Sequence, residues 1–386
     1  MYNNILVINL MHIGDLMLVT PILRTLRENF PEAKLTLLTD RILGDLVRYN
    51  ENLTECLLID KKGKDNNLWN FAKFIFMLRD KKYDLVINLH RNERASALAA
   101  FSGAAKIIGY AKPFFSLFFT QVMPNLKAYK HQIHSHFDVL REGGITSRMI
   151  DKGLEMTVPP DAERRIDKHW REYFSPGERV VALNIGASWL TKRWIDDYFA
   201  VCADKLIELG YTVIFLGGSM DINLVRDCAK KMKYRPPVAA ANIHSRDSKL
   251  RIYTGKLSLG EVAAVLRRCS LFITTDSGPM HIGVAMNVPI VTMFGSSPVP
   301  GFYPYDAKDV LIKTPEACHP CGKHQCPKSG DDHMACMKKI DAGIVMRYAE
   351  ELLEKYHGEP AYKLPPHYGE YKCRVIDLAH ETPGDD

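Results

Sequence analysis

Three loops in the sequence combine glycine with polar side chains at the point where a strand-like apolar run gives way to a helical pattern. The first loop contains Gly14 and Asp15, directly after the apolar run 5–10. Gly14 permits a tight turn, and a carboxylate at this point is placed to take a proton from an incoming hydroxyl group. Aspartate is also a common helix N-cap, and the junction taken alone favours that structural role for Asp15.

The second loop follows the apolar run 180–185 and leads into a helical pattern. It carries Gly186, Ser188, Thr191 and Lys192. The N–H groups at the start of a helix attract an anion, and hydroxyl groups with an adjacent cation add to such a site. We therefore expect this loop to bind a phosphate group, although a surface lysine by itself is usually only solvated.

The third loop follows the apolar run LFITT and opens another helix. Ser277 or Gly278 can cap this helix, and Pro279 suits its first turn, where a missing N–H does no harm. His281 lies in the same turn and can donate to a phosphate or a leaving group. Because a carboxylate repels a diphosphate, Asp276 is expected to accept from a ribose hydroxyl or to orient the loop. The alternative is a capped, buried helix with a satisfied histidine.

Several signatures of nucleotide and metal binding are absent from the sequence. No G-x-G-x-x-G follows the first strand-like run, which argues against a nicotinamide cofactor, and no G-x-x-x-x-G-K-[ST] indicates a P-loop NTPase. No Asp-x-Asp occurs either, so the carboxylate pair that often holds Mg²⁺ on a nucleotide sugar is not evident.

Strand-like runs alternate with helical patterns along both halves of the chain. Strands are expected at 5–10, 34–39, 84–89, 180–185, 211–216, 271–275 and 290–294, and helices at 16–29, 195–209 and 259–269. This alternation predicts βαβ units and parallel sheets, and the continuous apolar strands agree because such sheets are covered on both faces. The expected fold is α/β, with two Rossmann-like, doubly wound domains facing one another across a cleft.

Proline and glycine mark the boundaries between the expected domains. They occur at 158–160 and again at 175–177, which indicates a linker between the two halves. We expect an N-terminal domain over 1–165 and a C-terminal domain over 176–350. Residues 351–386 are expected to finish a helix and then form a loosely held tail, because the end of the chain is rich in proline and charge.

The composition excludes several classes of protein. Of the 386 residues, 46% are hydrophobic and 25% charged, which is typical of a folded soluble protein. The 51 basic and 45 acidic residues leave a net charge of +6, too small for a general nucleic-acid binder. No apolar run approaches the roughly 20 residues of a membrane span, and no Lys or Arg precedes the first apolar run as a signal peptide would require. We expect a cytoplasmic protein without a nucleic-acid partner.

Residues 81–130 concentrate positive charge beside aromatic side chains. The segment holds eight Lys and Arg against two acidic residues, and the four phenylalanines of 114–119 lie within it. This combination suits an anionic lipid acceptor at a membrane surface, with Arg91, Arg94 and Lys112 as contacts. The alternative is that the phenylalanines, which would share one helical face, belong to the core and the charges are solvated. Three nearby histidines match no metal motif and are expected to be acceptor-side or structural: His131, His134 and His136.

Four of the nine cysteines form a late cluster: Cys318, Cys321, Cys326 and Cys336. Four thiols over a short stretch could close a tetrahedral Zn²⁺ or iron site. The second pair is not C-x-x-C, so the zinc-ribbon pattern is only partial. The cluster is therefore expected to be a structural metal or redox clip, with reduced free thiols as the alternative.

Taken together, the three loops resemble those of the ADP-heptose:lipopolysaccharide heptosyltransferases, family 9 of the glycosyltransferases. The resemblance rests on Gly14-Asp15 with Thr20-Pro21 and Leu23-Arg24, on Thr191-Lys192-Arg193-Trp194, and on Asp276-Ser277-Gly278-Pro279-Met280-His281 with Phe294-Gly295. The motifs follow the family's order over residues 1–345. One departure is Ile107, where the family often carries Arg before Ile-Gly-Tyr, and it bears on the acceptor contacts more than on the donor site.

The resemblance implies a GT-B fold, with the acceptor in the N-terminal domain and the ADP-sugar in the C-terminal domain. It implies inversion of the anomeric centre without an obligatory metal, with Asp15 as general base on the acceptor hydroxyl and Gly14 beside the acceptor. Lys192 would contact the phosphate and sugar of the donor, and Asp276, Ser277, Gly278 and His281 would surround ADP. Helix amides and Lys192 would then stabilise the leaving group, which fits the absence of Asp-x-Asp.

The sequence therefore predicts an inverting glycosyltransferase that moves heptose from ADP-L-glycero-D-manno-heptose to the lipopolysaccharide inner core. Its partners would be ADP-heptose, an anionic lipid A–Kdo acceptor and, peripherally, the cytoplasmic face of the inner membrane. It would need no cofactor for the chemistry, with Zn or Fe as a structural ion at the cysteines. The alternatives are transfer to a protein hydroxyl, a nucleotide-sugar epimerase on the same fold and a non-catalytic ADP-sugar or lipid-binding protein. The basic aromatic segment argues against the epimerase, and Asp15 with Lys192 argues against the non-catalytic protein.

Overall fold

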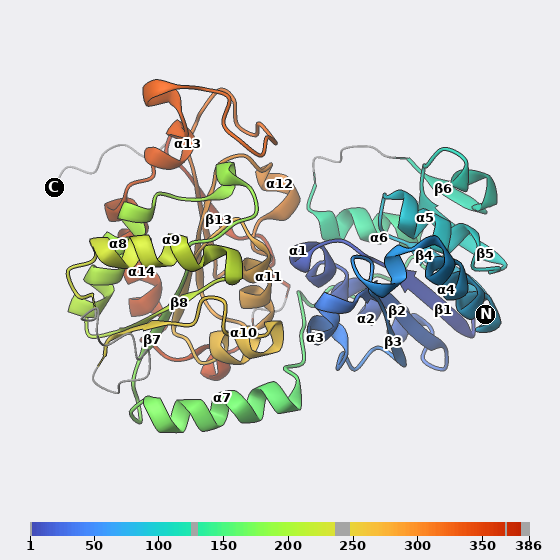
Figure 1. Cartoon of the computed structure of the whole chain (residues 1–386), viewed down its shortest axis with the longest axis horizontal. Coiled ribbons are helices and arrows are strands. Elements are labelled where there is room, and N and C mark those ends of the chain that lie inside the picture. Colours follow the sequence, from blue (N-terminus) through green and yellow to red (C-terminus); the bar gives the residue numbers. More distant parts are fainter. Residues whose placement is uncertain (1, 125–129, 236–247, 367–368, 380–386) are drawn as a thin grey trace. The chain divides into compact units, whose positions relative to one another are not determined.

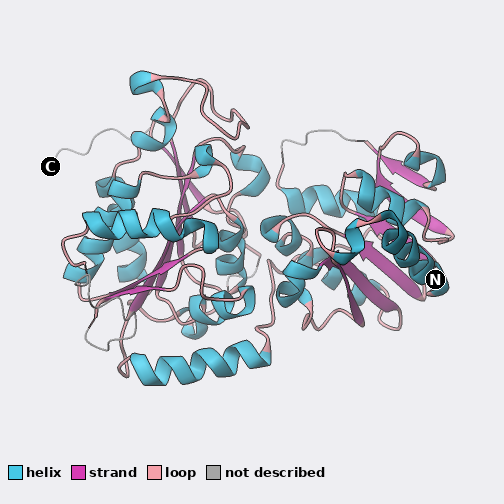
Figure 2. Cartoon of the chain, in the orientation of Figure 1, coloured by secondary structure: helices cyan, strands magenta, loops and turns pink. Residues whose placement is uncertain are grey.

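Short runs of branched apolar residues form two parallel β-sheets, each covered by helices (Figures 1 and 2). The computed structural model describes residues 2–124, 130–235, 248–366 and 369–379. The chain divides into two compact units, Met1–Thr157 and Val158–Asp386. The predicted α/β class, with a Rossmann-like arrangement in each half, is confirmed.

The first unit contains a six-stranded parallel sheet in the order β3-β2-β1-β4-β5-β6. Its strands are β1 (Asn4–Ile8), β2 (Lys34–Asp40), β3 (Glu55–Ile59), β4 (Leu85–Asn88), β5 (Lys106–Tyr110) and β6 (Gln121–Met123). Its α-helices are α1 (Ile13–Met17), α2 (Thr20–Asn29), α3 (Gly44–Val47), α4 (Leu68–Asp80), α5 (Glu93–Ala100) and α6 (Gln132–Glu142). At the centre of the sheet, Ile8 of β1 pairs with Leu38 of β2 on one side and with Asn88 of β4 on the other.

The second unit contains a seven-stranded parallel sheet in the order β13-β12-β11-β10-β7-β8-β9. Its strands are β7 (Val180–Asn184), β8 (Thr212–Leu216), β9 (Leu250–Ile252), β10 (Leu271–Thr275), β11 (Ile290–Phe294), β12 (Val310–Lys313) and β13 (Arg374–Asp377). Its α-helices are α7 (Pro160–Tyr173), α8 (Asp196–Glu208), α9 (Ile222–Lys231), α10 (Leu259–Leu266), α11 (Gly278–Ala285), α12 (Val299–Phe302), α13 (Ala335–Lys338) and α14 (Ala342–Lys355).

Apolar side chains pack on both faces of the sheets. In the second unit, Leu271 and Ile273 of β10 belong to a core shared with α8, α9 and α14. Phe272, between them, faces the opposite side, where α11 packs so closely that a Cβ at Gly283 would lie 2.9 Å from its ring. In the first unit, Leu6 of β1 packs toward α4 and α5. Because both faces of each sheet are buried, the sequences of these strands are apolar at nearly every position.

The segment predicted to be a linker is a helix of the second unit. α7 packs on α10, and Figure 1 shows the two helices side by side. Arg268 forms an ion pair with Glu163 of α7 at 2.6 Å. The first domain therefore ends at Thr157 rather than at residue 165, and the second begins directly after it. Contacts such as this ion pair attach α7 to the second unit, and the positions of proline and glycine in the sequence do not reveal such contacts.

The end of the chain is part of the second sheet and not a loosely held tail. β13 pairs in parallel with β12 at the edge of the sheet. Arg374 donates to both carboxylate oxygens of Glu351 on α14, each at 2.7 Å. The expected end of a helix after residue 350 is present, since α14 continues to Lys355. The loosely held tail expected from about Pro360 is wrong where β13 forms, while 367–368 and 380–386 lie outside the described residues.

The helix predicted over residues 16–29 is two helices. α1 ends at Met17, and α2 begins at Thr20 with Pro21 as its second residue. Because proline has no N–H to give to the preceding turn, it suits the start of a helix and breaks a continuous one. Pro21 therefore separates a short helix, which carries Asp15, from the longer helix behind it.

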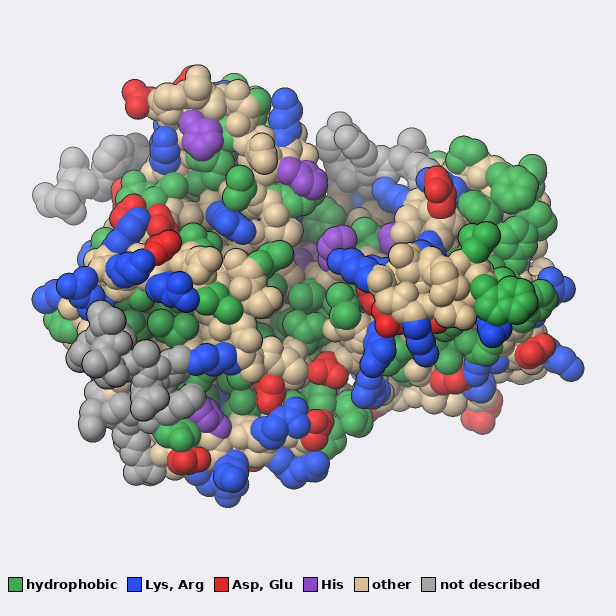
Figure 3. Space-filling view, in the orientation of Figure 1, with side chains coloured by type: hydrophobic (Ala, Val, Ile, Leu, Met, Phe, Trp, Pro, Cys, Tyr) green, Lys and Arg blue, Asp and Glu red, His purple; other side chains and the backbone are tan. Residues whose placement is uncertain are grey.

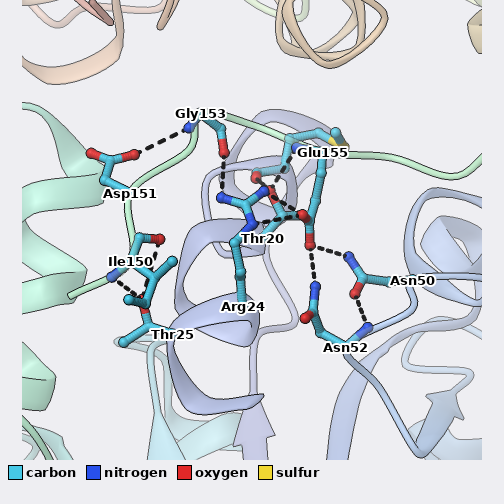
Figure 4. A network of polar contacts seen from close by, with 10 residues as sticks. Thr20, Arg24, Thr25, Asn50, Asn52, Ile150, Asp151, Gly153 and Glu155 are labelled. Atoms are coloured by element: carbon cyan, nitrogen blue, oxygen red, sulfur yellow. Dashed lines mark hydrogen bonds and ion pairs between the residues drawn. The ribbon is translucent and has the colours of Figure 1, made fainter. Parts of the chain in front are cut away.

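Arg24 of α2 and Glu155 form the centre of a polar network in the first unit (Figure 4). Arg24 Nε donates to Glu155 Oε2 at 2.9 Å, and its Nη1 donates to the carbonyl of Gly153 at 3.1 Å. The side-chain amides of Asn50 and Asn52 donate to Glu155 Oε1 at 2.9 and 2.6 Å. Arg24 is only 8% exposed, so it depends on this carboxylate. The network fastens the last residues of the first unit to α2.

Replacing Glu155 by alanine is expected to lower the free energy of unfolding by about 3 kcal/mol, since it leaves Arg24 buried without a counter-charge. Glu155→Gln should cost less, because its amide oxygen still accepts from the two asparagines. Urea denaturation of both variants measures the effect, with the exposed Glu142→Ala as the matched control. A loss below about 1 kcal/mol for Glu155→Ala would show that the network is only a surface contact.

Candidate functional sites at the two switch points

Each sheet has one switch point, which is the pair of neighbouring strands from which the order of strands runs outward in opposite directions. In the first unit it lies between β1 and β4, and in the second between β7 and β10. Ligands of such sheets bind at the carboxyl ends of these strands, where the loops part. We call the loops 9–15 and 88–94 the first-unit site, and the loops 184–192 and 275–281 the second-unit site.

Asp15 lies in the first-unit site as the third residue of α1. Its Oδ2 accepts a hydrogen bond from the backbone N–H of His12 at 3.4 Å, and the side chain is half-buried. The N-cap of α1 is therefore His12 and not Asp15, whose carboxylate instead closes a capping box from the third position of the helix. A carboxylate offers about four acceptor positions, so capping fixes its orientation without excluding a reacting proton.

Three residues that the sequence reasoning did not assign to the site add basic groups there: His12, Lys61 and His90. Lys61 Nζ donates to the carbonyl of Leu10 at 2.6 Å and pairs with Asp40 at 3.0 Å. Burial, together with the nearby Lys61 and His12, lowers the pKa of His90 to about 4, so its ring is neutral at pH 7. Lys61 and His90 each lie two residues after a strand, and this position is the signal that could have revealed them.

Arg91, which the sequence predicts to contact the acceptor, lies in the loop after β4 and so in the first-unit site. Its exposed guanidinium lies 4.3 Å from the centroid of the Tyr110 ring at the end of β5. His136 of α6 is 1% exposed, and neither of its ring nitrogens has a hydrogen-bond partner in the described part of the chain. Burial and the nearby Arg91 lower the pKa of His136 to about 3. Of these two groups, only Arg91 offers a positive charge to an anion at pH 7, because His136 is neutral.

The other two basic residues predicted for the acceptor are held by protein groups. Arg94 Nη1 donates to the carbonyl of Lys61 at 2.9 Å, and Nη2 donates to Asn66 Oδ1 at 2.7 Å. Lys112 Nζ lies 3.4 Å from the exposed carboxylate of Glu93. Arg94 therefore fixes the loop that carries Lys61, whereas the Lys112 pair is a weak surface contact that a ligand can displace.

Asn184, the last residue of β7, organises the second-unit site. Its Nδ2 lies 3.1 Å from the carbonyl oxygen of Gly186, 3.2 Å from Thr274 Oγ1 and 2.9 Å from Ser277 Oγ. Thr275 Oγ1 donates to the same Gly186 carbonyl at 2.9 Å. These contacts join the loops after β7 and β10. Ser277 is the N-cap residue of α11, yet its side chain makes no capping bond and faces Asn184 instead.

Gly186 is required by the close approach of Asp221. A Cβ at Gly186 would lie 2.2 Å from Asp221 Cγ, so a larger residue cannot enter unless Asp221 moves. Asp221 Oδ2 accepts from the N–H of Gly218 at 2.9 Å, which closes the loop after β8. The sequence reasoning missed Asp221, because nothing in the spacing after Gly218 separates it from an ordinary surface aspartate.

Lys192 and Asp276 form an ion pair in the second-unit site. Lys192 Nζ lies 2.9 Å from Asp276 Oδ2, and the two side chains are 20% and 5% exposed. Asp276 therefore directs the ammonium group to the carboxyl end of β10. The sequence suggested that Asp276 accepts from a ribose hydroxyl or orients its own loop, and it did not predict this pairing with Lys192.

His281 lies in the first turn of α11 and is 4% exposed. Burial is the main cause that lowers the pKa of His281 to about 4. The charge of Asp276 raises this pKa, and the charge of Lys192 lowers it. The Nδ1 of His281 has no hydrogen-bond partner among the described residues. At pH 7 the ring is therefore a neutral donor, and positive charge comes from Lys192 and the N–H groups of α11.

The second loop leads into α8, which begins within one residue of the helix predicted over 195–209. Leu190–Lys192 form one 3-10 turn, and α8 begins only at Asp196, followed by Asp197. Two carboxylates in the first turn make that helix a poor place for a phosphate. Ser188 is exposed beside the turn, whereas Thr191 is buried below it. The helix that offers N–H groups to this site is α11.

Comparison with known proteins decides the family. The sequence model of glycosyltransferase family 9 (heptosyltransferase) matches residues 71–330, which is more than half of the chain. The chain belongs to glycosyltransferase family 9. The predicted enzyme class and the GT-B fold are thereby confirmed.

Individual relatives agree with the family. Lipopolysaccharide heptosyltransferase 3 of Escherichia coli is 27% identical over 293 residues, covering 74% of this chain and 81% of that protein. A family 9 glycosyl transferase from Veillonella parvula DSM 2008 is 30% identical, with a TM-score of 0.80 over 92% of this chain and 98% of that one. E. coli ADP-heptose lps heptosyltransferase II shares the fold at 18% identity, with a TM-score of 0.73 over 92% and 99% of the two chains.

The four late cysteines of this family 9 enzyme lie between β12 and α14, in the segment 314–341, which we call the cysteine loop, and Cys336 is on the short helix α13 within it. Burial and the thiols of Cys318, Cys321 and Cys326 raise the pKa of Cys336 to about 11, so the four groups are near one another. Within the described residues, however, no three His, Cys, Asp or Glu side chains are arranged to hold a metal ion. The suggested Zn or Fe site is therefore not formed with these side-chain positions, and no step of the reaction is assigned to it.

The phenylalanine cluster of the enzyme does not share one helical face. Phe115–Phe118 form a single 3-10 turn, in which Phe115 packs inward with Phe119. Phe114 and Phe118 are 61% and 43% exposed, and Leu117 is 83% exposed. The core and surface alternatives each hold for part of the cluster. Among the described helices, none combines the length and the apolar character needed to cross a membrane.

Proposed function

We propose that this family 9 glycosyltransferase transfers heptose from ADP-L-glycero-D-manno-heptose to the lipopolysaccharide inner core. The main support is that each unit carries one polar switch-point site, with Asp15 and basic groups in the first and Lys192 with the start of α11 in the second. This division suits a reaction of two substrates. The donor and acceptor classes follow the relatives, one named lipopolysaccharide heptosyltransferase 3 and the other ADP-heptose lps heptosyltransferase II.

In the proposed reaction, Asp15 accepts the proton of an acceptor hydroxyl in the first-unit site. The acceptor oxygen forms a bond to the anomeric carbon of heptose on the face opposite ADP. The bond from that carbon to the diphosphate oxygen breaks, and ADP leaves with the electron pair. One displacement inverts the anomeric configuration, and the proton remains on Asp15 until it passes to solvent.

We assign the stabilisation of the leaving diphosphate to Lys192, the neutral donor His281 and the N–H groups at the start of α11. A fixed cation and fixed dipoles act strongly where charge develops in the transition state. Ser188 is exposed and available to the donor, and Gly278 supplies a backbone N–H. The hydroxyl of Thr191 donates to the carbonyl of Lys323, so we give Thr191 a structural role.

We assign recognition of the anionic lipid A–Kdo acceptor to the basic groups of the first-unit site. Arg91 is exposed there, and Lys61, which pairs with Asp40 at 3.0 Å, lies nearby. A guanidinium and an ammonium bind carboxylate and phosphate in different geometries, so together they suit an acceptor that carries both. Lys112 and Gly14 complete the proposed rim, and Arg94 supports the loop of Lys61.

Mass spectrometry of the acceptor tests the proposed function. A deacylated, Kdo-bearing lipid A core incubated with ADP-heptose and the enzyme should gain one heptosyl residue, with inverted anomeric configuration by NMR. Transfer to a protein hydroxyl instead would change the acceptor class. Conversion of the nucleotide sugar without any acceptor would indicate an epimerase and would contradict the proposal.

We further propose that the first unit contacts the inner membrane peripherally through an apolar surface on α4 and the turn Phe115–Phe118. Leu68 and Trp69 at the start of α4 are 87% and 71% exposed, and Leu117 lies on the turn. Other side chains of both elements pack on the same core, so the two elements cover one face of the sheet. Figure 3 shows hydrophobic side chains gathered on the part of the first unit that carries α4 and β6. Lys73, whose Nζ lies 5.3 Å from the Trp69 ring, adds positive charge for anionic lipids.

Replacing Leu117 by aspartate is expected to weaken binding to anionic phospholipid vesicles by about tenfold, since one buried leucine contributes roughly 1.5–3 kcal/mol. Transfer to the soluble, deacylated acceptor should stay unchanged. Vesicle co-sedimentation measures the binding, with Leu209→Asp in the second unit as a control that alters a 46% exposed leucine elsewhere. Equal losses in both variants would contradict a membrane surface at this place.

The proposed chemistry needs no metal, because Lys192 and α11 take the charge of the leaving group. A structural Zn²⁺ or iron ion in the cysteine loop stays a separate proposal, supported by the proximity of the four thiols and by their suitability as ligands. Such an ion would require the side chains to shift from the positions described. Elemental analysis of the purified enzyme, beside its Cys336→Ser variant, tests it.

A further inference from the structure

Trp189 lies in the second-unit site and contacts His324 of the cysteine loop. Its indole ring stacks on the imidazole of His324, with ring centroids 4.0 Å apart and planes inclined by 23°. Lys192 Nζ lies 4.8 Å from the centroid of a ring of the same indole. Trp189 is half-buried and His324 is exposed, so the imidazole covers part of the indole that would otherwise meet water.

The chain around His324 is fastened to the loop that carries Lys192. The N–H of Thr191 lies 3.4 Å from the carbonyl oxygen of His324, and the hydroxyl of Thr191 donates to the carbonyl of Lys323. Gly322 N–H donates to the carbonyl of Ser296 at 2.9 Å. The stack is therefore not a chance contact of two surface rings, because the backbones that carry them are hydrogen-bonded to each other.

Lys192 is a long side chain that needs several contacts to stay in one place. Its ion pair with Asp276 fixes the ammonium at one point only, and a lysine loses up to about 2 kcal/mol of rotamer freedom when it is held. The face of an indole attracts a cation within about 6 Å of the ring. Trp189 is thus a second contact, and it stays in place when an incoming diphosphate competes with Asp276 for the ammonium.

We propose that Trp189, held by His324, is a positioning residue that keeps the Lys192 ammonium directed at the donor diphosphate. This inference rests on the proposed function, in which Lys192 contacts that diphosphate. It also gives the cysteine loop a task in the reaction, since His324 lies between Cys321 and Cys326 and brings the loop against Trp189.

A double-mutant cycle on the full-length enzyme tests the proposal. Trp189→Leu is expected to raise the KM for ADP-heptose about fivefold, the size of a partly exposed cation–π contact, with the acceptor KM unchanged. Trp189→Phe, which keeps an aromatic face, should stay within about twofold of the wild type. In a Lys192→Ala background, Trp189→Leu should add less than about twofold, because the group that it positions is gone. His324→Ala should show a smaller effect of the same kind, and His333→Ala in the same loop should show none.

The outcomes separate this inference from the function on which it rests. If Lys192→Ala leaves kcat/KM for ADP-heptose and the calorimetric affinity for ADP unchanged, the proposed role of Lys192 is wrong. If Lys192→Ala weakens both, but Trp189→Leu still multiplies the loss by its full factor in that background, Trp189 acts independently of Lys192 and the positioning role is overturned. In variants that no longer catalyse transfer, the affinity for ADP measured by calorimetry replaces the KM in the double-mutant cycle.

Discussion

Asp15→Asn is expected to reduce heptosyl transfer by about 10³-fold while the affinity for ADP changes by less than about twofold. A general base contributes roughly 10²–10⁴-fold to such a reaction, and an amide cannot accept the proton. The asparagine oxygen can still accept from the N–H of His12, so α1 keeps its cap and the fold is preserved. The variant thus removes the proposed chemistry and leaves the structural role of the residue in place.

Single-turnover assays with saturating substrates measure this loss, and calorimetry measures ADP binding. Asp45→Asn is a matched control, because Asp45 also lies in the first turn of a short helix of the first unit. A parallel loss of transfer and of thermal stability in Asp15→Asn would show that the residue is only a cap. Full activity would remove it from the mechanism.

Lys192→Ala is expected to lower kcat/KM for ADP-heptose by about 10²-fold. A single fixed donor at a developing negative charge is worth about 10²–10³-fold, and the ammonium also binds the diphosphate before reaction. Lys192→Arg should recover only part of the loss, because the planar guanidinium cannot take the same position against Asp276. Initial rates at varied donor concentration measure both variants.

The exposed Lys205 on α8 provides the control for loss of one positive charge in the second unit. Lys205→Ala should leave the rate unchanged. The role of Lys192 would be contradicted if its alanine variant lost activity only through a higher acceptor KM, since that result would place the lysine with the other substrate.

The sequence was sufficient to predict the parallel sheets, because a strand covered on both faces must be apolar throughout. The strands 271–275 and 290–294 are predicted to the residue, and the loops with Asp15, Lys192 and Asp276 were found as ends of strands. The position of a polar residue after such a strand carries information because all parallel strands end at one edge. That rule also covers Lys61 and His90, each of which lies two residues after a strand, although the strand before Lys61 is not among those that the sequence predicts.

Other features depend on contacts between distant segments, and local patterns do not contain them. The ion pairs of α7 with Arg268 assign the expected linker to the second unit, and β13 is a strand through its pairing with β12. Asp221 is recognised only through its contact with Gly186. Pro21 is an exception, because the break between α1 and α2 could have been predicted from the proline alone.

Acceptor-dependent release of ADP is the most direct test of the central claim. Purified enzyme is given ADP-heptose with and without the deacylated, Kdo-bearing lipid A core, and ADP is followed over time. The proposed function predicts release only when the acceptor is present and almost none from Asp15→Asn. Tight ADP binding with no acceptor-dependent release would contradict transfer to the inner core.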